Sequence, residues 1–244
     1  MDLIREVLAL SRDGLDREEW LRIVSSIEAV SDYYDRVNEL STLFQADKWR
    51  RSAIDFSGPG LDILEIGSGP GSFAMLLRGR SVVCVEPSEK LIGVARRRTA
   101  GNIQFAAGVA EELPIATESF DRIFCSFSFR DFSDKEKSLR EMLRVLRKDG
   151  VAVIVDIAKR EGRLKSWLVK SYLKNMVPFL SKFVIPRSEM KEWNGNPYDT
   201  LWVTYDHFET PGCYAESMRG MGFKDVEWKL LSMGGAFLLS GVKR

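Results

Sequence analysis

Short apolar runs alternate with helical stretches from residue 61 onward, and this alternation constrains the fold more than any other feature. The runs typical of strands are LDILEI (61–66), SVVCVE (81–86), NIQFAAG (102–108), SFDRIFCSFSF (119–129) and VAVIVDIA (151–158). Helices are expected between them: one carrying Phe73, Met75, Leu76 and Leu77, one from Ser88 to Arg98, and one from Asp134 to Arg147. Such alternation predicts a parallel sheet covered by helices on both faces.

Two further apolar runs close the chain. KDVEWKLLS (224–232) and GGAFLLSGVKR (234–244) follow a helix expected from Pro211 to Met221, and they are joined at Met233-Gly234-Gly235. A joint this tight is typical of antiparallel neighbours. We therefore expect an α/β fold with a seven-stranded, mostly parallel sheet and an antiparallel last strand.

The first 57 residues show helical periodicity instead. One apolar face has Leu3, Val7, Leu8 and Leu10, a second has Trp20, Leu21, Val24 and Ile27, and a third helical stretch is expected from about residue 31 to 54. A break of about fifty helical and irregular residues also follows Ala158. We expect a helical N-terminal lobe at 1–57 and a core at 58–244, with 159–207 as an inserted lid.

Composition excludes several classes of partner. The 36 Lys and Arg nearly balance the 35 Asp and Glu, so bulk charge gives no reason to expect nucleic acid. Cys84, Cys125 and Cys213 share no short spacing, and neither a metal site nor a disulfide framework is expected. No signal peptide is evident, and no run approaches the ~18–20 apolar residues of a membrane span. We therefore expect a cytoplasmic location.

The glycine-rich turn LEIGSGPGSF (64–73) follows the first strand, where a backbone closely approaches a ligand. A Walker loop requires a Lys that is missing here. In the dinucleotide fingerprint G-x-G-x-x-G the third glycine would come one residue later than Gly71. Glu65, just before the turn, would oppose a pyrophosphate but tolerate a ligand that carries an ammonium and a sulfonium.

Two later features indicate an adenosine ligand. Glu86 ends the second strand about twenty residues beyond the turn, where a carboxylate accepts hydrogen bonds from ribose hydroxyls. The loop VAEELP (109–114) follows the third strand and can offer backbone N–H groups to an adenine edge.

Together these features resemble the class I S-adenosylmethionine-dependent methyltransferases, whose motif E-x-G-x-G-x-G is matched at 65–71. The resemblance implies a Rossmann-like fold, S-adenosylmethionine as cofactor and S-adenosylhomocysteine as product. The cofactor-binding residues expected on this basis are Tyr34, Glu65, Gly67, Ser68, Gly69, Gly71, Glu86, Pro87, Val109, Ala110, Glu111, Ser126 and Phe127. Val109 stands where the family often has Asp or Asn.

Within that superfamily the chain is similar to the ubiquinone/menaquinone biosynthesis C-methyltransferases. The matching segments are YDRVN (34–38) with Trp49-Arg50 after it, SFSFRDFSD (126–134) for S-F-G-L-R-N-V-x-D, and RVLRKDG (144–150) for R-V-L-K-P-G-G. Phe44, Ala46 and Asp131 replace the family's Gly, His and Asn. The resemblance implies C-methylation of a small apolar or aromatic acceptor, a quinone precursor. A methyltransferase of another small metabolite and a non-catalytic S-adenosylmethionine-binding module stay open as alternatives.

The candidate catalytic residues are Arg130, Asp131 and His207. The first two end a strand at the sheet edge where open α/β folds bind ligands. We expect Arg130 to stabilise a phenolate and Asp131 to accept a proton or orient a water, unless they pair with each other or cap the next helix. His207, the only histidine, is either a base or a packing or surface residue. Tyr34 either closes over the cofactor or packs in the core.

Residues 163–187 carry six basic residues and no acid, interleaved with Trp167, Tyr172, Phe179 and Phe183. This pattern suits a lid over an apolar substrate or peripheral contact with an anionic membrane. A cap helix with a solvated basic face is the alternative. We expect a small-molecule acceptor as the partner, and a chain that acts as a monomer or homodimer.

Overall fold

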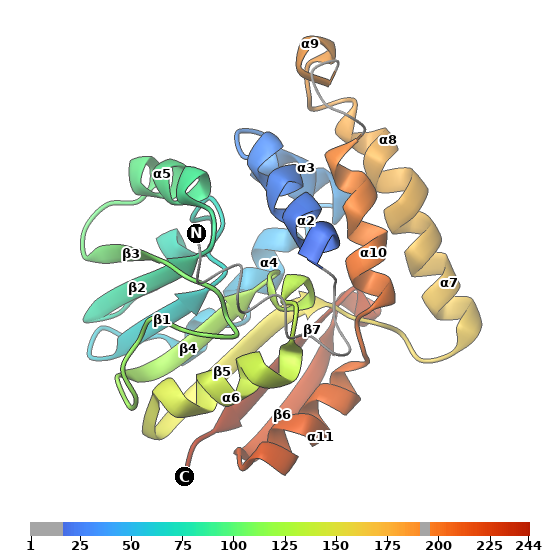
Figure 1. Cartoon of the computed structure of the whole chain (residues 1–244). Coiled ribbons are helices and arrows are strands. Elements are labelled where there is room, and N and C mark those ends of the chain that lie inside the picture. Colours follow the sequence, from blue (N-terminus) through green and yellow to red (C-terminus); the bar gives the residue numbers. More distant parts are fainter. Residues whose placement is uncertain (1–16, 191–195) are drawn as a thin grey trace.

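A seven-stranded sheet forms the centre of the computed structural model, which describes residues 17–190 and 196–244 (Figure 1). Its strands are β1 (Asp62–Ile66), β2 (Ser81–Glu86), β3 (Ile103–Ala107), β4 (Phe120–Ser126), β5 (Leu146–Ile157), β6 (Lys224–Leu231) and β7 (Ala236–Val242). They lie in the order β3-β2-β1-β4-β5-β7-β6. The first five run parallel, and β7 is antiparallel to both β5 and β6. The predicted Rossmann-like fold with an antiparallel last strand is confirmed.

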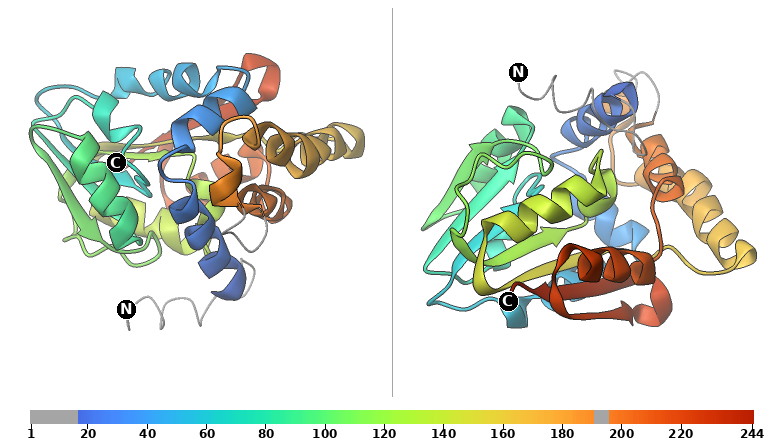
Figure 2. Two further views of the ribbon diagram at one scale, coloured as in Figure 1. Left: turned by 90° about the horizontal axis from the view of Figure 1, so that it is seen from above. Right: turned by 60° about the horizontal axis from the view of Figure 1, so that its bottom comes forward.

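Alternate side chains of each strand face two different apolar layers, as the two-residue period of a strand requires. Leu64 and Ile66 of β1 belong to the layer under helices α6 (Lys135–Val145) and α11 (Pro211–Met221). Ile63, the residue before Leu64, belongs to the opposite layer, which includes Trp49 of helix α4 (Ala46–Arg51). Figure 2 shows α4 on one side of the sheet and α6 and α11 on the other.

The core helices begin where the sequence predicts, but α6 ends at Val145, two residues before the predicted Arg147, because Leu146 and Arg147 already belong to β5. Helix α5 (Glu89–Arg98) begins after Ser88, whose Oγ accepts a hydrogen bond from the Leu91 N–H. Asp134 caps α6 in the same way, through the Lys137 N–H. Each side chain satisfies a backbone donor that a helix start leaves without a partner. Helix α11 ends at Gly222, which has φ +109°, a backbone conformation that favours glycine.

The helix predicted after the glycine turn is wrong, because only a 3₁₀ turn, η3 (Ala74–Leu76), is present there. The chain must return from the end of β1 to the start of β2 within this connection. Leu77, the residue after η3, has an extended backbone with ψ 139°. Extended residues span about 3.3 Å each and helical ones about 1.5 Å, so the extended backbone covers the return in this short connection.

The N-terminal helices also differ from expectation. The single stretch predicted at 31–54 is divided into α3 (Tyr34–Ser41), α4 and the 3₁₀ turn η2 (Ile54–Phe56). Leu43 and Phe44 have φ values of +52° and +60°, which a helix cannot include. In α2 (Arg17–Ala29) the buried residues are Trp20 and Ile23, whereas Leu21 is exposed and its predicted place on the apolar face is wrong. The predicted face of Leu3, Val7, Leu8 and Leu10 lies outside the described residues.

A cap of helices covers the edge of the sheet where β4 and β5 end (Figures 1 and 2). It combines α2 and α3 with α7 (Arg163–Ser171), the π-helical turn η5 (Tyr172–Met176), α8 (Val177–Ser181), α9 (Arg187–Met190), the 3₁₀ turn η6 (Pro197–Thr200) and α10 (Leu201–Asp206). Val37 of α3 and Val177 of α8 share one buried cluster, and the Tyr172 hydroxyl donates to the Ser41 carbonyl at 2.7 Å. The division into a lobe at 1–57 and a lid at 159–207 stays a prediction, but the described parts of both segments pack against each other. No helix in the described ranges is long and apolar enough to cross a membrane.

Candidate functional site

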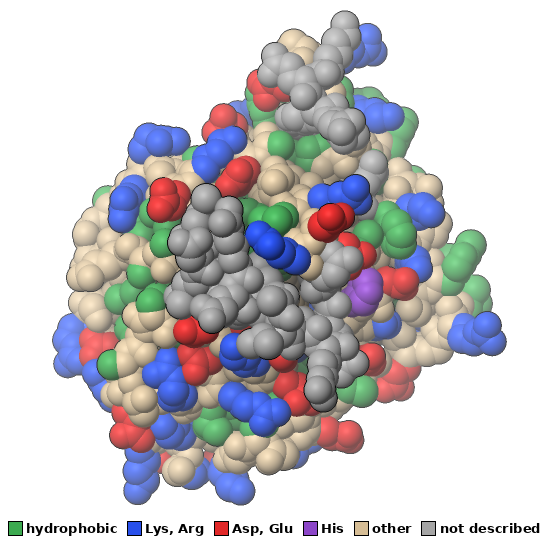
Figure 3. Space-filling model, viewed as in Figure 1, with side chains coloured by type: hydrophobic (Ala, Val, Ile, Leu, Met, Phe, Trp, Pro, Cys, Tyr) green, Lys and Arg blue, Asp and Glu red, His purple; other side chains and the backbone are tan. Residues whose placement is uncertain are grey.

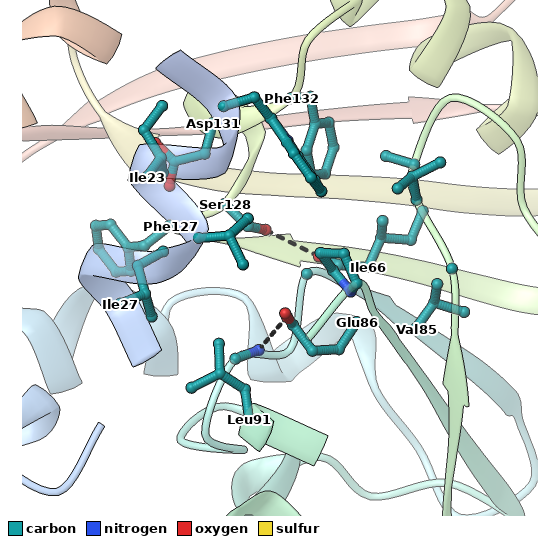
Figure 4. A pocket seen from close by; sticks show the side chains of 18 of the residues that line it. Ile23, Ile27, Ile66, Val85, Glu86, Leu91, Phe127, Ser128, Asp131 and Phe132 are labelled. Atoms are coloured by element: carbon teal, nitrogen blue, oxygen red, sulfur yellow. Dashed lines mark hydrogen bonds between the residues drawn. The ribbon is translucent and has the colours of Figure 1, made fainter. Parts of the chain in front are cut away.

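A cavity of about 650 Å³ lies where β1 and β2 end, beneath helix α2 (Figure 4). The cavity is lined by Trp20, Ile23, Val24, Ile27, Tyr34, Ile66, Gly67, Gly69, Val85, Glu86, Pro87, Leu91, Gly108, Val109, Ala110, Glu111, Phe127, Ser128, Asp131 and Phe132. Many of the cofactor-binding residues expected from the sequence therefore lie together, and their role in binding stays a prediction.

The glycine turn forms the floor of this cavity with conformations that favour glycine. Gly67 and Gly69 have φ values of +71° and +53° and line the cavity. A Cβ on Gly67 would lie 2.5 Å from Cβ of Ser128, whose hydroxyl donates to the Ile66 carbonyl at 2.8 Å. Gly71 does not line the cavity, since it packs against Ala95 of α5. The turn thus exposes bare backbone to a ligand.

Glu86 is the acidic group at the centre of the cavity wall. Its side chain is buried, and its two oxygens accept hydrogen bonds from the Gly69 N–H at 2.8 Å and the Ser88 N–H at 3.1 Å. Burial raises the pKa of Glu86 to about 7, although both backbone hydrogen bonds act to lower the pKa. Each carboxylate oxygen keeps a further lone pair for a hydroxyl donor.

Apolar side chains enclose the rest of the cavity, and helix α2 supplies its roof. Trp20 packs against Val109, and Ile23 and Ile27 face the cavity from the same helix (Figure 4). The amphipathic pattern at Trp20, Val24 and Ile27 was a signal for this roof, but periodicity alone does not indicate what a helix covers. Glu111 accepts from both the N–H and the hydroxyl of Ser133, so it also holds the turn before α6.

Glu65, Ser68 and Ser126 do not line any described cavity, although the resemblance implied cofactor binding for all three. Glu65 is 1% exposed and accepts a hydrogen bond from the Cys84 thiol at 3.5 Å in the layer beneath the turn. Burial raises its pKa to about 8. Glu65 thus lies beneath the turn rather than on the wall of the cavity.

A second cavity, of about 500 Å³, shares Tyr34 and Phe127 with the first. Arg130 and Arg50 also line it, and the Arg50 guanidinium lies 5.6 Å from the centre of the Phe127 ring. Arg50 belongs to the segment that matches the family, but the sequence predicts no role for it in the site. A third cavity, of about 430 Å³, is lined by both Arg130 and Asp131. Tyr34 lines all three cavities.

Arg130 and Asp131 form a buried charged cluster with Asp156 of β5. Arg130 donates to Asp156 from its backbone N–H at 3.1 Å and from Nη1 at 2.7 Å, and its Nε lies 3.5 Å from Asp131 Oδ1. Burial alone would lower the pKa of Arg130, but Asp131 and Asp156 raise it above the usual value. Burial raises the pKa of Asp131 to about 6, against the opposite effect of Arg130. Arg130 is therefore always charged, whereas Asp131 titrates near neutral pH.

His207 lies apart from this cluster. It follows α10 with an exposed side chain, and its Nδ1 lies 3.1 Å from the Val203 carbonyl of the same helix. It lines none of these cavities. The geometry matches the alternative of a surface residue, because a base must come within hydrogen-bond reach of its proton.

The first cavity fits S-adenosylmethionine. Its bare glycine backbone allows close approach of the amino-acid part, Glu86 can accept from ribose hydroxyls, and apolar side chains around Val109 and Leu91 suit an adenine ring. The shared wall of Tyr34 and Phe127 leaves the second cavity for an acceptor.

We expect the affinity for S-adenosylhomocysteine to fall about tenfold per pH unit below pH 7, the pKa of Glu86, because the ribose hydroxyls favour the ionised carboxylate. Glu86→Gln should weaken binding about 10–100-fold at pH 8, since a hydrogen bond to a charged group contributes about 1.5–3 kcal/mol. Calorimetry between pH 6 and 8.5 measures both effects. Glu112→Gln, an exposed neighbour, is the matched control. An unaltered pH dependence in Glu86→Gln would contradict the assignment.

Residues 17–243 match the model of the ubiE/COQ5 methyltransferase family. The chain is 30% identical over 228 residues to a demethylmenaquinone methyltransferase of Clavibacter sepedonicus, covering 91% of this chain and 90% of that protein. It is 29% identical over 240 residues to the ubiquinone/menaquinone biosynthesis C-methyltransferase UbiE of Rubrivivax gelatinosus, covering 96% and 90%.

Solved structures share the fold. A Thermotoga maritima S-adenosylmethionine-dependent methyltransferase, described as a possible histamine N-methyltransferase, has a TM-score of 0.65 at 24% identity, covering 91% of this chain and all of that one. Phosphoethanolamine N-methyltransferase 2 of Haemonchus contortus, solved with S-adenosylmethionine, has a TM-score of 0.59 at 14% identity, covering 80% and 52%. Because the family model matches nearly the whole chain, this protein belongs to the ubiE/COQ5 methyltransferase family and is an S-adenosylmethionine-dependent methyltransferase.

Proposed function

We propose that this enzyme methylates a ring carbon of a hydroquinone, a precursor of a respiratory quinone. The observation that carries the proposal is the buried pair of Arg130 and Asp131, which lies where the cofactor cavity meets the two neighbouring cavities. A permanent cation beside a carboxylate that titrates near pH 6 suits an acceptor that must lose a phenolic proton. The names of the relatives in Clavibacter and Rubrivivax support the same class of acceptor.

When bound, S-adenosylmethionine supplies a methyl group that its sulfonium already activates for transfer. In this proposal, Asp131 accepts the phenolic proton, and Arg130 stabilises the oxygen anion, whose electron density makes the adjacent ring carbon nucleophilic. Tyr34 and Phe127, on the wall common to two cavities, align the ring and exclude water. The ring proton of the methylated carbon then passes to water, which restores the aromatic ring, and Asp131 returns the phenolic proton to the oxygen anion.

Arg130→Lys should lower kcat at least about 100-fold, because an ammonium keeps the charge but loses the fork that holds Asp156 and the acceptor oxygen together. Affinity for S-adenosylhomocysteine should stay within threefold, since Arg130 does not line the first cavity. Mass spectrometry of a demethylated naphthoquinol after incubation measures turnover, and calorimetry measures binding. If the wild-type protein binds the cofactor but methylates no quinol, the acceptor class is wrong.

Turnover should fall about tenfold per pH unit below pH 6, because the protonated Asp131 carboxyl cannot accept a proton. Asp131→Asn should remove this acid limb and lower kcat about 100-fold at pH 8, within the usual contribution of a general base. The family pattern has Asn at this position, so a carboxylate base would be peculiar to this chain. Undiminished turnover of Asp131→Asn at pH 8 would show that residue 131 only orients a water.

We propose further that this enzyme is cytoplasmic and contacts an anionic membrane through residues 163–187. The exposed apolar residues from α7 through η5 and α8 to the turn after α8 recur at helical spacing, and all have exposed fractions of 44% or more: Leu164, Trp167, Leu168, Met176, Phe179 and Phe183. We call them the lid stripe. Figure 3 shows hydrophobic and basic side chains interleaved along the edge of the molecule where α7 lies. All six charged residues within 163–187 are basic, although one of them, Lys170, pairs with Asp206 of α10. An exposed apolar stripe among basic residues suits an anionic lipid surface.

Lys165→Glu with Lys182→Glu should reduce sedimentation with vesicles of phosphatidylglycerol and phosphatidylcholine at least tenfold, because each basic residue near such a surface contributes about 1 kcal/mol. Both lysines are exposed. The matched control is Lys224→Glu with Lys229→Glu, two exposed lysines on β6. Equal sedimentation of the two variants, or none for the wild type at low salt, would remove the membrane contact.

A further inference from the structure

Each turnover of the methyl transfer has to release a proton. S-adenosylmethionine carries a positive sulfonium and S-adenosylhomocysteine does not, so replacing a ring hydrogen by a methyl group sets a proton free. In the proposed reaction Asp131 already holds the phenolic proton when the ring proton departs. Asp131 cannot take this second proton. Water therefore has to carry it out of a site that apolar side chains largely enclose.

Of the cavities that meet at the site, the third has the lining that suits a proton. The first cavity fits the cofactor. Among the described residues, Arg50 and Arg130 line the second cavity without any carboxylate, so a proton would move there against like charges. In the third cavity Arg130 lies beside Asp131, which balances its charge. Hydroxyl and amide side chains from α2, α3, η6 and α10 line the rest of it: Ser26, Asn38, Tyr198, Thr200 and Thr204.

The hydroxyl of Tyr198 is a buried polar group that calls for a partner. The residue is 5% exposed, and its hydroxyl has no hydrogen-bond partner within the described ranges. Buried polar groups of this kind are usually satisfied by ordered water. Burial, and after it the Tyr34 phenol on the same cavity, raises the pKa of Tyr198 above its usual value. Tyr198 thus stays protonated and suits holding a water molecule rather than taking a proton.

Polar groups on the same wall supply the further partners that a buried water needs, roughly two to four in all. Thr204 of α10 is 1% exposed and lies close enough to bond to the Asp131 carboxylate. Arg130 Nε is buried and has no acceptor within hydrogen-bond distance in the described parts of the chain. A water beside Tyr198 in this cavity therefore has both donors and acceptors around it.

The polar lining continues outward from this buried end. Ser26 on α2 and Thr200 on η6 are only half-buried, and these two elements pack against each other. Ile23 and Ile27 of α2 line both the first and the third cavity, and Figure 4 shows Asp131 beside Ile23. These apolar side chains keep water in the third cavity apart from the cofactor, while its outer end opens toward solvent.

We propose that the third cavity is the proton exit of this enzyme, in which water held by the hydroxyls of Tyr198 and Thr204 takes the ring proton and passes it between α2 and η6 to solvent. The C–H bond of the methylated carbon breaks, its electron pair restores the aromatic ring, and the proton leaves as hydronium. This inference rests on the proposed hydroquinone acceptor for the source of the proton, but the cavity assigns its path. Tyr198 and Thr204 are positioning residues, because they act on water.

The test compares two rates within a single turnover of a demethylated naphthoquinol. Rapid quench measures formation of S-adenosylhomocysteine, and stopped flow with a pH indicator in weak buffer measures proton release. The two rates should be equal in the wild-type protein. In Tyr198→Phe proton release should be at least about fivefold slower than S-adenosylhomocysteine formation, because a proton acceptor has to lie within hydrogen-bond reach. Deuterium on the ring carbon should widen this gap, whereas a merely structural effect would slow both rates together.

Tyr205→Phe is the matched control. Tyr205 is 1% exposed and its hydroxyl also lacks a partner within the described ranges, but it does not line the third cavity. This variant should keep the two rates equal. Thr204→Val, which removes a hydroxyl at nearly constant volume, should open a gap in the same direction as Tyr198→Phe, and equal rates there would remove Thr204 from the exit. Equal rates in Tyr198→Phe, or a similar gap in Tyr205→Phe, overturn the proposal.

A second readout does not need an acceptor. A crystal structure of the wild-type protein with S-adenosylhomocysteine should show ordered water within hydrogen-bond distance of Tyr198 Oη, and Tyr198→Phe should lose that water. Ordered water there without methylation of any quinol would refute the proposed acceptor but support the hydrated cavity. A third cavity without ordered water beside Tyr198 overturns the exit, whatever the turnover.

Discussion

The ion pair between Arg130 and Asp156 holds the site together. Asp156 is fully buried at the end of β5, and it accepts from the backbone and the guanidinium of Arg130 as well as from the N–H of Ile157. The turn after β4 is thus fixed to the neighbouring strand, which places Phe127 between two cavities and Ser128 against Gly67. Removing one partner of a buried ion pair costs about 3–5 kcal/mol of stability. Moving Arg130 away from Asp156 would therefore be costly.

Polar contacts between the N-terminal helices and the cofactor loops complete the enclosure. Asp35, in the first turn of α3, pairs with Arg98 at the end of α5 and accepts from Ser72 beyond the glycine turn. Glu28, near the end of α2, accepts from Ser88, the residue that caps α5. These contacts tie α2 and α3 to both ends of α5, so the roof over the cofactor cavity depends on the strands and turns beneath it.

The sheet, the caps and the cofactor turn could be predicted because each depends on local sequence. Strand periodicity, Ser88, Asp134 and the three glycines act over a few residues, and the structure has the predicted elements at these positions. Packing between distant segments has no such local signal. The second cavity joins Tyr34 and Arg50 to Leu173 and Val177, and no pattern within either segment indicates the other. The same limit explains His207, because whether α10 turns that ring inward depends on the helices packed beside it.

The cap couples two requirements that would otherwise conflict. Methyl transfer needs a site without water, whereas the acceptor must still be able to enter that site. Here the described parts of the N-terminal lobe and of the lid meet over one edge of the sheet, and their shared interior is the cluster around Val37, Leu173 and Val177. Leu173 and Val177 also line the second cavity. The same side chains therefore seal the site against water and form part of the wall of the cavity that Arg130 lines. Arg50 and Arg130 supply positive charge to the same cavity, so an acceptor held there would meet apolar side chains and fixed cations together.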